Sequence, residues 1–170
     1  SIYEPYVRDT AITFEYDVPT LEEFKNRIKD ISSKYPYIKA VDKSEILGYA
    51  YAHAFRERKA YDWSVETTIY VKQGRHRMGI GKLLYMALEE SLKNMGILNM
   101  NACIAVPVKE DEHLTYDSYD FHKSMGFSLV GRFHKVGYKF NTWYDSVWME
   151  KMLGKHNDFP QEVLFGKWDM

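Results

Sequence analysis

The feature that most constrains the fold is a strand that runs directly into a glycine-containing loop and then into a helix. The strand, WSVETTIYV, is rich in β-branched and aromatic residues, and the loop KQGRHRMGIGK follows it without a break. Apolar residues then recur every three or four positions, which predicts one buried helix face made of Ile80, Leu83, Leu84, Ala87, Leu88, Leu92 and Met95. Gly96 stands where a C-terminal cap belongs, so the helix should end there.

The segments on either side predict a mixed α/β (α+β) chain. A Pro-Thr start signal predicts a helix from about Leu21 to Lys34, and YIKAVD with ILGYAYAHAF predicts an antiparallel hairpin turning at Lys43 to Glu45. After the central helix we expect a strand (LNMNACIAV), a polar loop, a short helix (SYDFHKSMGF) and two further strands. We predict a single domain over residues 1–153, followed by an irregular tail over residues 154–170.

Composition excludes some classes of partner. Lys and Arg total 23 against 24 Asp and Glu, so the net charge gives no argument for nucleic acid or for an anionic membrane. No apolar run approaches 18 residues, and the lone Cys103 cannot form an intrachain disulfide, which suits a reducing compartment. We therefore expect a cytoplasmic protein with no nucleic-acid or membrane partner, in which Cys103 is a buried structural thiol.

The glycine loop fails two nucleotide-binding patterns. From Gly74 the next glycine is Gly79, as in a P-loop, but Ile80 occupies the lysine position; a dinucleotide motif needs a third glycine where Leu84 stands. What remains is an anion cradle formed by backbone N–H groups at a helix N-terminus, over residues 77–82, with basic side chains at its rim. The alternative is an ordinary solvated turn.

The wider sequence around this loop resembles a known family. RHRMGIGKLL resembles the pyrophosphate-binding segment of the GNAT superfamily of N-acetyltransferases, Gln/Arg-x-x-Gly-x-Gly/Ala, with His76 at the Gln/Arg position. TAITFE, AYDWSVETTIYV, FHKSMGF and VGYKFNTWYD resemble the phosphinothricin N-acetyltransferase branch, in order over roughly Thr10 to Leu153. The resemblance implies the GNAT fold, a mixed, mostly antiparallel twisted sheet flanked by helices. The family's first strand should precede SIYEPYV, so we expect this sequence to lack it.

The resemblance also implies acetyl-CoA as co-substrate. Its pantetheine arm should add along the strand from Glu66 to Val71 like an extra strand. The cofactor-binding residues implied are Ile69, Tyr70, Val71, His76, Arg77, Met78, Gly79, Ile80, Gly81, Lys82, Thr115 and Ser118. Thr115 stands where the family commonly has an asparagine, within a polar loop that is longer than usual.

Two residues match catalytic positions of the branch. Glu66 matches the general base, and His122 matches a histidine that would protonate the leaving thiolate or orient the thioester. If the thioester lies near Ile69, the separation from Glu66 is roughly 10 Å at ~3.3 Å per residue, so proton removal should run through water. The alternatives are a solvent-facing glutamate paired with a cation, and a buried, hydrogen-bonded histidine.

The acceptor is the part that the sequence defines least. Aromatic residues predict the walls of a small amine site, with core or dimer packing as the alternative: Phe14, Tyr61, Trp63, Tyr138 and Trp143. We predict direct acetyl transfer, in a ternary complex, to the primary amine of an amino-acid-like small molecule of the phosphinothricin or methionine sulfoximine type. Rival functions are a peptide or ribosomal-protein N-terminal acetyltransferase and a noncatalytic acyl-CoA-binding regulatory module. The resemblance implies a homodimer, and KEDEH lacks metal-site spacing, so we expect no metal.

Overall fold

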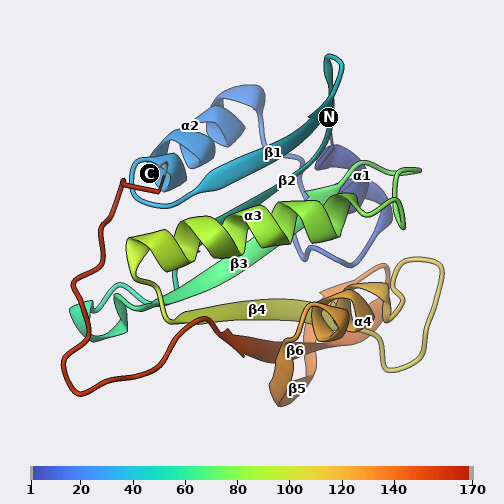
Figure 1. Cartoon of the computed structure of the whole chain (residues 1–170). Coiled ribbons are helices and arrows are strands. Elements are labelled where there is room, and N and C mark those ends of the chain that lie inside the picture. The colour runs from blue at the N-terminus through green and yellow to red at the C-terminus, as the bar shows by residue number, and fades with distance from the viewer. Residues whose placement is uncertain (1, 169–170) are drawn as a thin grey trace. The chain divides into compact units, whose positions relative to one another are not determined.

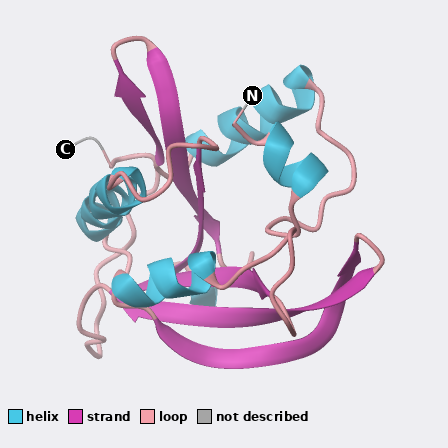
Figure 2. Ribbon diagram, turned by 90° about the vertical axis from the view of Figure 1, so that its right-hand side faces the viewer, coloured by secondary structure: helices cyan, strands magenta, loops and turns pink. Residues whose placement is uncertain are grey.

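The structure is a computed structural model that describes residues 2–168. Its elements in chain order are α1 (Glu4–Asp9), α2 (Leu21–Ser32), β1 (Tyr37–Asp42), β2 (Glu45–Ala54), the short 3-10 helix η1 (Lys59–Tyr61), β3 (Ser64–Val71), α3 (Ile80–Met95), β4 (Asn99–Val106), α4 (Asp117–Ser124), β5 (Ser128–Lys139) and β6 (Thr142–Met152) (Figure 1). Every helix and strand expected from the sequence is present, and α1 and η1 are additional (Figure 2). The mixed α/β class is confirmed.

The chain divides into two compact units. Unit 1 comprises Ser1–Pro19 and Ala102–Lys151, and unit 2 comprises Thr20–Asn101 and Met152–Met170. The strand order is β1-β2-β3-β4-β6-β5, in which β4 begins in unit 2 and ends in unit 1. Pairing is antiparallel for β1/β2, β2/β3 and β5/β6, and parallel for β3/β4. The single domain predicted over residues 1–153 stays a prediction.

Unit 2 is built on β1, β2 and β3, with α3 lying across these strands (Figure 1). Small and β-branched side chains that alternate along β2 and β3 are fully buried, among them Ala50, Ala52 and Val65. The intervening residues face the other way, where Phe24 of α2 meets Tyr49 edge-on at 6.1 Å between ring centroids. The two faces of this layer are therefore covered by different helices.

The central helix α3 begins and ends as the sequence predicts. Gly79 precedes it and Gly96 follows it, both with left-handed backbone that glycine adopts without strain. The predicted buried face needs one correction, because Leu83 is 64% exposed whereas Tyr85 is fully buried. Buried side chains that recur every four residues along α3 already fill its contact with the strands, so Leu83 lies on the flank of the helix.

A small buried hydrogen-bond cluster joins α3, β3 and β4 within unit 2. The Thr67 hydroxyl donates to the Asn101 carbonyl oxygen at 3.2 Å and lies 3.3 Å from the Tyr85 hydroxyl. The Asn101 side-chain amide donates to the Val65 carbonyl oxygen at 3.1 Å. Burial without partners is costly for each of these groups, so the cluster favours one register of β3 against β4.

Unit 1 contains the β5/β6 hairpin, the later residues of β4, and the helices α1 and α4. Its core cluster consists of Ala11, Ala105, Leu114 and Tyr144, with Phe14 and Phe140 packed against it. Lys139 is 4% exposed, and its ammonium donates to the carbonyl oxygens of Val7, Thr10 and Thr13 at 2.8–2.9 Å. This buried charge links both α1 and the segment after it to β5.

The long polar loop between β4 and α4 is folded around Asp111. One carboxylate oxygen accepts from the backbone N–H groups of His113 and Leu114, both at 2.8 Å, and the other accepts from the Tyr144 hydroxyl at 2.8 Å. Although burial acts to raise the pKa of Asp111, these hydrogen bonds outweigh it and lower the pKa overall. Burial and the same contact raise the pKa of Tyr144 to about 12. The loop therefore has a structural anchor.

The C-terminal tail contains no helix or strand between residues 154 and 168, yet it is attached to unit 2. The Trp63 indole donates to the Gln161 carbonyl oxygen at 2.7 Å, and the Leu164 N–H donates to the Met95 carbonyl oxygen at 2.9 Å. Phe165 meets Tyr35 edge-on at 5.5 Å. In the described part of the chain, no helix is both long and apolar enough to cross a membrane.

We predict that Asp111→Asn and Tyr144→Phe each lower the free energy of unfolding by about 1–2 kcal/mol at pH 7, because each removes a partner from a charge-assisted hydrogen bond. A lowered folded-state pKa means that Asp111 stabilises the protein above the ordinary aspartate pKa of about 3.9, and that this contribution is lost as pH falls through the folded-state pKa. Thermal unfolding of Asp111→Asn should therefore differ from wild type at pH 6–7 and approach it near pH 3. An equal difference at both pH values would contradict this role.

Candidate functional site

The loop between β3 and α3 contains three residues with left-handed backbone. Gly74, Arg77 and Gly79 adopt left-handed backbone, with φ of 77°, 60° and 79°. Successive left- and right-handed residues turn neighbouring N–H groups toward one concave side, and the start of a helix adds its positive dipole there. Arg77 is the only one of the three with a side chain, and non-glycine residues hold this conformation at a cost that is common at functional sites. The predicted residues from His76 to Lys82 lie along this turn.

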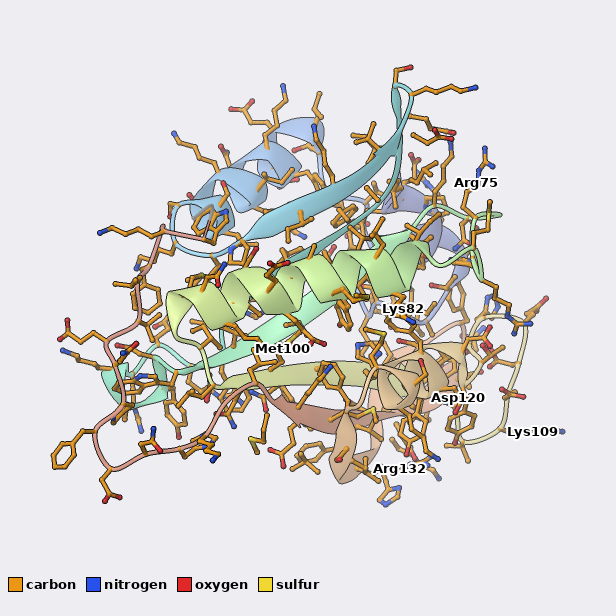
Figure 3. The ribbon with its side chains drawn as sticks, in the orientation of Figure 1. Arg75, Lys82, Met100, Lys109, Asp120 and Arg132 are labelled. Carbon is orange, nitrogen blue, oxygen red and sulfur yellow. The ribbon has the colours of Figure 1, made fainter. Side chains whose placement is uncertain are left out.

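A salt-bridge cluster that the sequence analysis did not identify holds the base of the loop. Glu45, at the start of β2, pairs with Lys72 and, at 3.4 Å, with Arg75. The Lys72 hydrogen bond and charge, with a smaller contribution from Arg75, lower the pKa of Glu45. Figure 3 shows Arg75 and Lys82 near the end of α3 where the helix begins. Arg75, one of the basic side chains expected at the rim of the loop, therefore links the loop to the β1/β2 hairpin.

The strand β3 leads from Glu66 to this loop. Its residues Ile69, Tyr70 and Val71, expected along the pantetheine arm, are half-buried and lie opposite Ala50, Tyr49 and Gly48 of β2. Parallel pairing with β4 covers Ser64–Glu66, at the other end of the strand. Glu66 and the loop residues thus belong to one rigid strand-loop-helix arrangement inside unit 2.

Glu66 has an immediate neighbour that the sequence reading missed. His53 lies directly opposite it in the β2/β3 register, with Nε2 4.0 Å from the Glu66 Oε2. The two side chains are 38% and 23% exposed, so both remain accessible to water. The alternation of β2 was the available signal, since it places Tyr49, Tyr51 and His53 on one face.

His122 lies in unit 1, in the last turn of α4, and is 3% exposed. Its Nδ1 lies 2.7 Å from the Ser118 carbonyl oxygen, which can only accept, so Nδ1 carries the hydrogen. Burial lowers the pKa of His122 to about 4, against the opposing effect of that hydrogen bond. The ring is therefore neutral at pH 7, with its lone pair on Nε2.

The remaining predicted cofactor residues also lie in unit 1. Thr115 is exposed, and its hydroxyl accepts from the Asp117 N–H at 3.3 Å, so it helps to start α4. Ser118 lies in the first turn of α4 and orients His122 through its backbone carbonyl.

The five aromatic residues proposed for the acceptor site have different surroundings. In unit 1, Tyr138 and Trp143 form an exposed ring pair with centroids 5.0 Å apart, and Phe14 packs against Gly137 of the same hairpin. In unit 2, Tyr61 packs edge-on against Phe55 at 5.8 Å, and Trp63 anchors the tail. The structure thus provides packing partners for several of them.

Two further expectations concern cysteine and metal. Cys103 is exposed, so the prediction of a buried thiol is wrong; it lies at a position of β4 whose neighbours Ala102 and Ile104 face the core instead. Its Sγ lies 3.1 Å from the Ser146 hydroxyl. Between residues 2 and 168, no group of three or more His, Cys, Asp or Glu side chains could hold a metal ion.

Comparison with known proteins identifies the family. The sequence profile of the acetyltransferase (GNAT) domain matches residues 1–148. The chain is 36% identical over 156 residues to a phosphinothricin N-acetyltransferase of Streptomyces coelicolor, covering 89% of this chain and 87% of the relative. It is 31% identical over 127 residues to an L-methionine sulfoximine/L-methionine sulfone acetyltransferase of Pseudomonas paraeruginosa, covering 74% and 70%.

A solved structure agrees with these sequence matches. The fold matches the crystal structure of a GNAT superfamily phosphinothricin acetyltransferase from Sinorhizobium meliloti in complex with acetyl-CoA, with a TM-score of 0.85 and 33% identity over 95% of this chain and 85% of the other. The strand-loop-helix arrangement, the profile match over most of the chain and this shared fold lead to one conclusion: the chain belongs to the GNAT acetyltransferase family.

Proposed function

We propose that this protein transfers the acetyl group of acetyl-CoA to the primary amine of an amino-acid-like small molecule. The observation that carries the proposal is the continuity of β3, which bears Glu66 and leads into the left-handed turn at the start of α3. Membership of the GNAT family and the phosphinothricin and methionine sulfoximine enzymes among its relatives support the acceptor class. We place the reaction in the cytosol, as expected from the lone cysteine.

The cofactor would be held mainly by backbone. The N–H groups of residues 76–82 suit the pyrophosphate because they combine a concave turn with a helix N-terminus, and Arg77 and Lys82 add positive charge. Backbone groups of residues 69–71 suit the amides of the pantetheine arm. Thr115 and Ser118 are proposed as further contacts near α4.

Glu66 is proposed as the general base. It removes a proton from the acceptor ammonium, through water, so that the amine nitrogen can attack the thioester carbonyl carbon in a ternary complex. Exposure of 23% leaves room for that water beside the carboxylate. We propose that the acceptor contacts Phe14, Tyr138 and Trp143. Tyr61 and Trp63 are proposed to support the walls of the acceptor site by packing behind them.

His122 is proposed to orient the thioester. Of its two suggested roles, proton donation needs a hydrogen on Nε2, whereas a neutral ring with its hydrogen on Nδ1 has a lone pair there. With a pKa of about 4, only about one ring in a thousand is protonated at pH 7. This state supports the orienting role.

We predict that Glu66→Gln lowers kcat/KM for a phosphinothricin-type amine by about 100-fold or more, because positioned general bases contribute on that order. The KM for acetyl-CoA should change little, since the loop is untouched. His122→Asn should cause a smaller loss, without removing a titration near pH 7. Steady-state thiol release over a panel of amines and peptides measures both variants.

Glu90→Gln, on the exposed side of α3, is the matched control and should behave as wild type. Unchanged kcat/KM in both Glu66→Gln and His122→Asn would show that the assigned roles are wrong. Preference for a peptide N-terminus over amino acids would favour the peptide acetyltransferase, and tight CoA binding without any transfer would favour a noncatalytic module.

Gly79→Ala should raise the KM for acetyl-CoA by about 5–10-fold with a smaller effect on kcat. No atom lies within 4 Å of the added Cβ, so the change acts through the left-handed φ of 79°, which costs about 1–2 kcal/mol for alanine. Gly131→Ala, whose added Cβ also has open space but whose φ is not left-handed, is the control. Equal acetyl-CoA affinity in both variants would argue against the cradle.

The protein is also proposed to be a homodimer. β5 is last in the strand order and exposes Leu129, Val130, Phe133 and Val136, each at least 52% accessible, and apolar groups of this kind commonly mark interfaces. Sedimentation should give a dimer, and Phe133→Lys should shift it toward monomer. A monomer at every concentration would contradict the proposal.

A further inference from the structure

We propose that His53 is the proton-accepting partner of Glu66 and passes the proton released in each acetyl transfer to solvent. The inference rests on the proposed function, because it extends the role given there to Glu66. In this role His53 acts through Glu66 and does not itself contact the acceptor or the cofactor. It lies on β2, thirteen positions before Glu66 in the chain, and the two meet only through strand pairing.

The contact is set by the register of two adjacent strands. His53 and Glu66 are directly opposite, where Cβ atoms of antiparallel strands lie about 4.5–5.5 Å apart. The distance of 4.0 Å between Nε2 and Oε2 suits an ion pair when the ring is protonated. It is too long for a direct hydrogen bond, so a small rotation or a bridging water would connect the two groups.

The orientation of the ring presents the correct nitrogen. The Nδ1 of His53 lies 3.1 Å from the Ala54 carbonyl oxygen, and because a carbonyl only accepts, Nδ1 carries the hydrogen. In the neutral ring the lone pair is therefore on Nε2, which faces Glu66. The arrangement can accept a proton from the Glu66 side without first losing one.

Aromatic and polar side chains share this face of the strands with the pair. Tyr51 lies beside the His53 ring on β2, Thr68 of β3 lies opposite Tyr51, Tyr37 of β1 stacks on Tyr51, Phe24 of α2 contacts Tyr49, and Arg56 follows β2. Among these, Arg56 is the charged one, and its guanidinium lies over the Phe55 ring at 4.6 Å. Glu66 is thus the acidic group that pairs with His53 across the strands.

The proton balance of the reaction requires a route by which one proton reaches solvent. The acceptor ammonium loses one proton, its nitrogen bonds to the acyl carbon, the C–S bond breaks with its electrons on sulfur, and the second N–H proton converts that thiolate to thiol. One proton per turnover must therefore reach solvent. The His53 side chain is more exposed than Glu66, 38% against 23%, and imidazole is the side chain that exchanges protons near neutral pH.

His53→Gln tests the proposal, because glutamine keeps hydrogen-bonding capacity but cannot titrate. We expect kcat/KM at pH 7 to fall about tenfold, and the ratio of wild type to variant to approach one at about pH 10, where the acceptor amine deprotonates without help. The KM for acetyl-CoA should not change. A purely structural role would instead give the same fractional loss at every pH, and that result, or no loss at all, would overturn the inference.

His156→Gln is the matched control, since His156 lies in the C-terminal tail, where its ring bonds to the Asn99 side chain, and the pH profile of this variant should superimpose on that of wild type. Absence of transfer by wild type would overturn the proposed function as well, whereas parallel pH profiles in an active enzyme would overturn only the role of His53.

Discussion

The hydrogen-bond cluster of Thr67, Asn101 and Tyr85 is the constraint on which unit 2 depends. It fixes the register of β3 against β4 while Val65 and Thr67 face α3. Because side chains alternate along a strand, this register forces Glu66 to the opposite face, and a slip of one residue would bury its carboxylate against the helix. The position of the proposed base is thus a consequence of polar groups on the other side of the sheet.

The same strand links two kinds of chemistry that need different environments. Its early part carries Glu66, opposite His53 of β2, and both side chains have the partial access to water that proton transfer requires. Its end passes into the left-handed turn that we propose to bind the cofactor pyrophosphate, and this turn is held by the Glu45 pairs with Lys72 and Arg75. A rigid strand keeps these two parts at a fixed distance, which supports transfer between bound partners more directly than flexible loops would.

The anchors of unit 1 show how buried polar groups organise irregular segments. Asp111 anchors the long loop by accepting hydrogen bonds from two N–H groups and from Tyr144, and Lys139 donates to one carbonyl oxygen of α1 and to two in the segment that follows it. The acidic loop lacks the spacing of a metal site, and the carboxylate of Asp111 within it has a structural role. Loops of this length are ordered by such local satisfaction of backbone groups.

The sequence alone determined the elements and the family. Short-range periodicity and glycine caps specified the strand-loop-helix unit, the ends of α3 and the β1/β2 hairpin, since these depend on neighbours a few residues away. The motif match located Glu66 and the glycine loop within the chain. Tertiary structure decided which distant residues meet, such as His53 with Glu66 and Glu45 with Arg75. It also decided that Leu83 and Cys103 are exposed, and that burial keeps His122 neutral by lowering its pKa. Strand register, burial and the partners of charged groups join residues far apart in sequence, so they follow from packing of the whole chain and not from any local pattern.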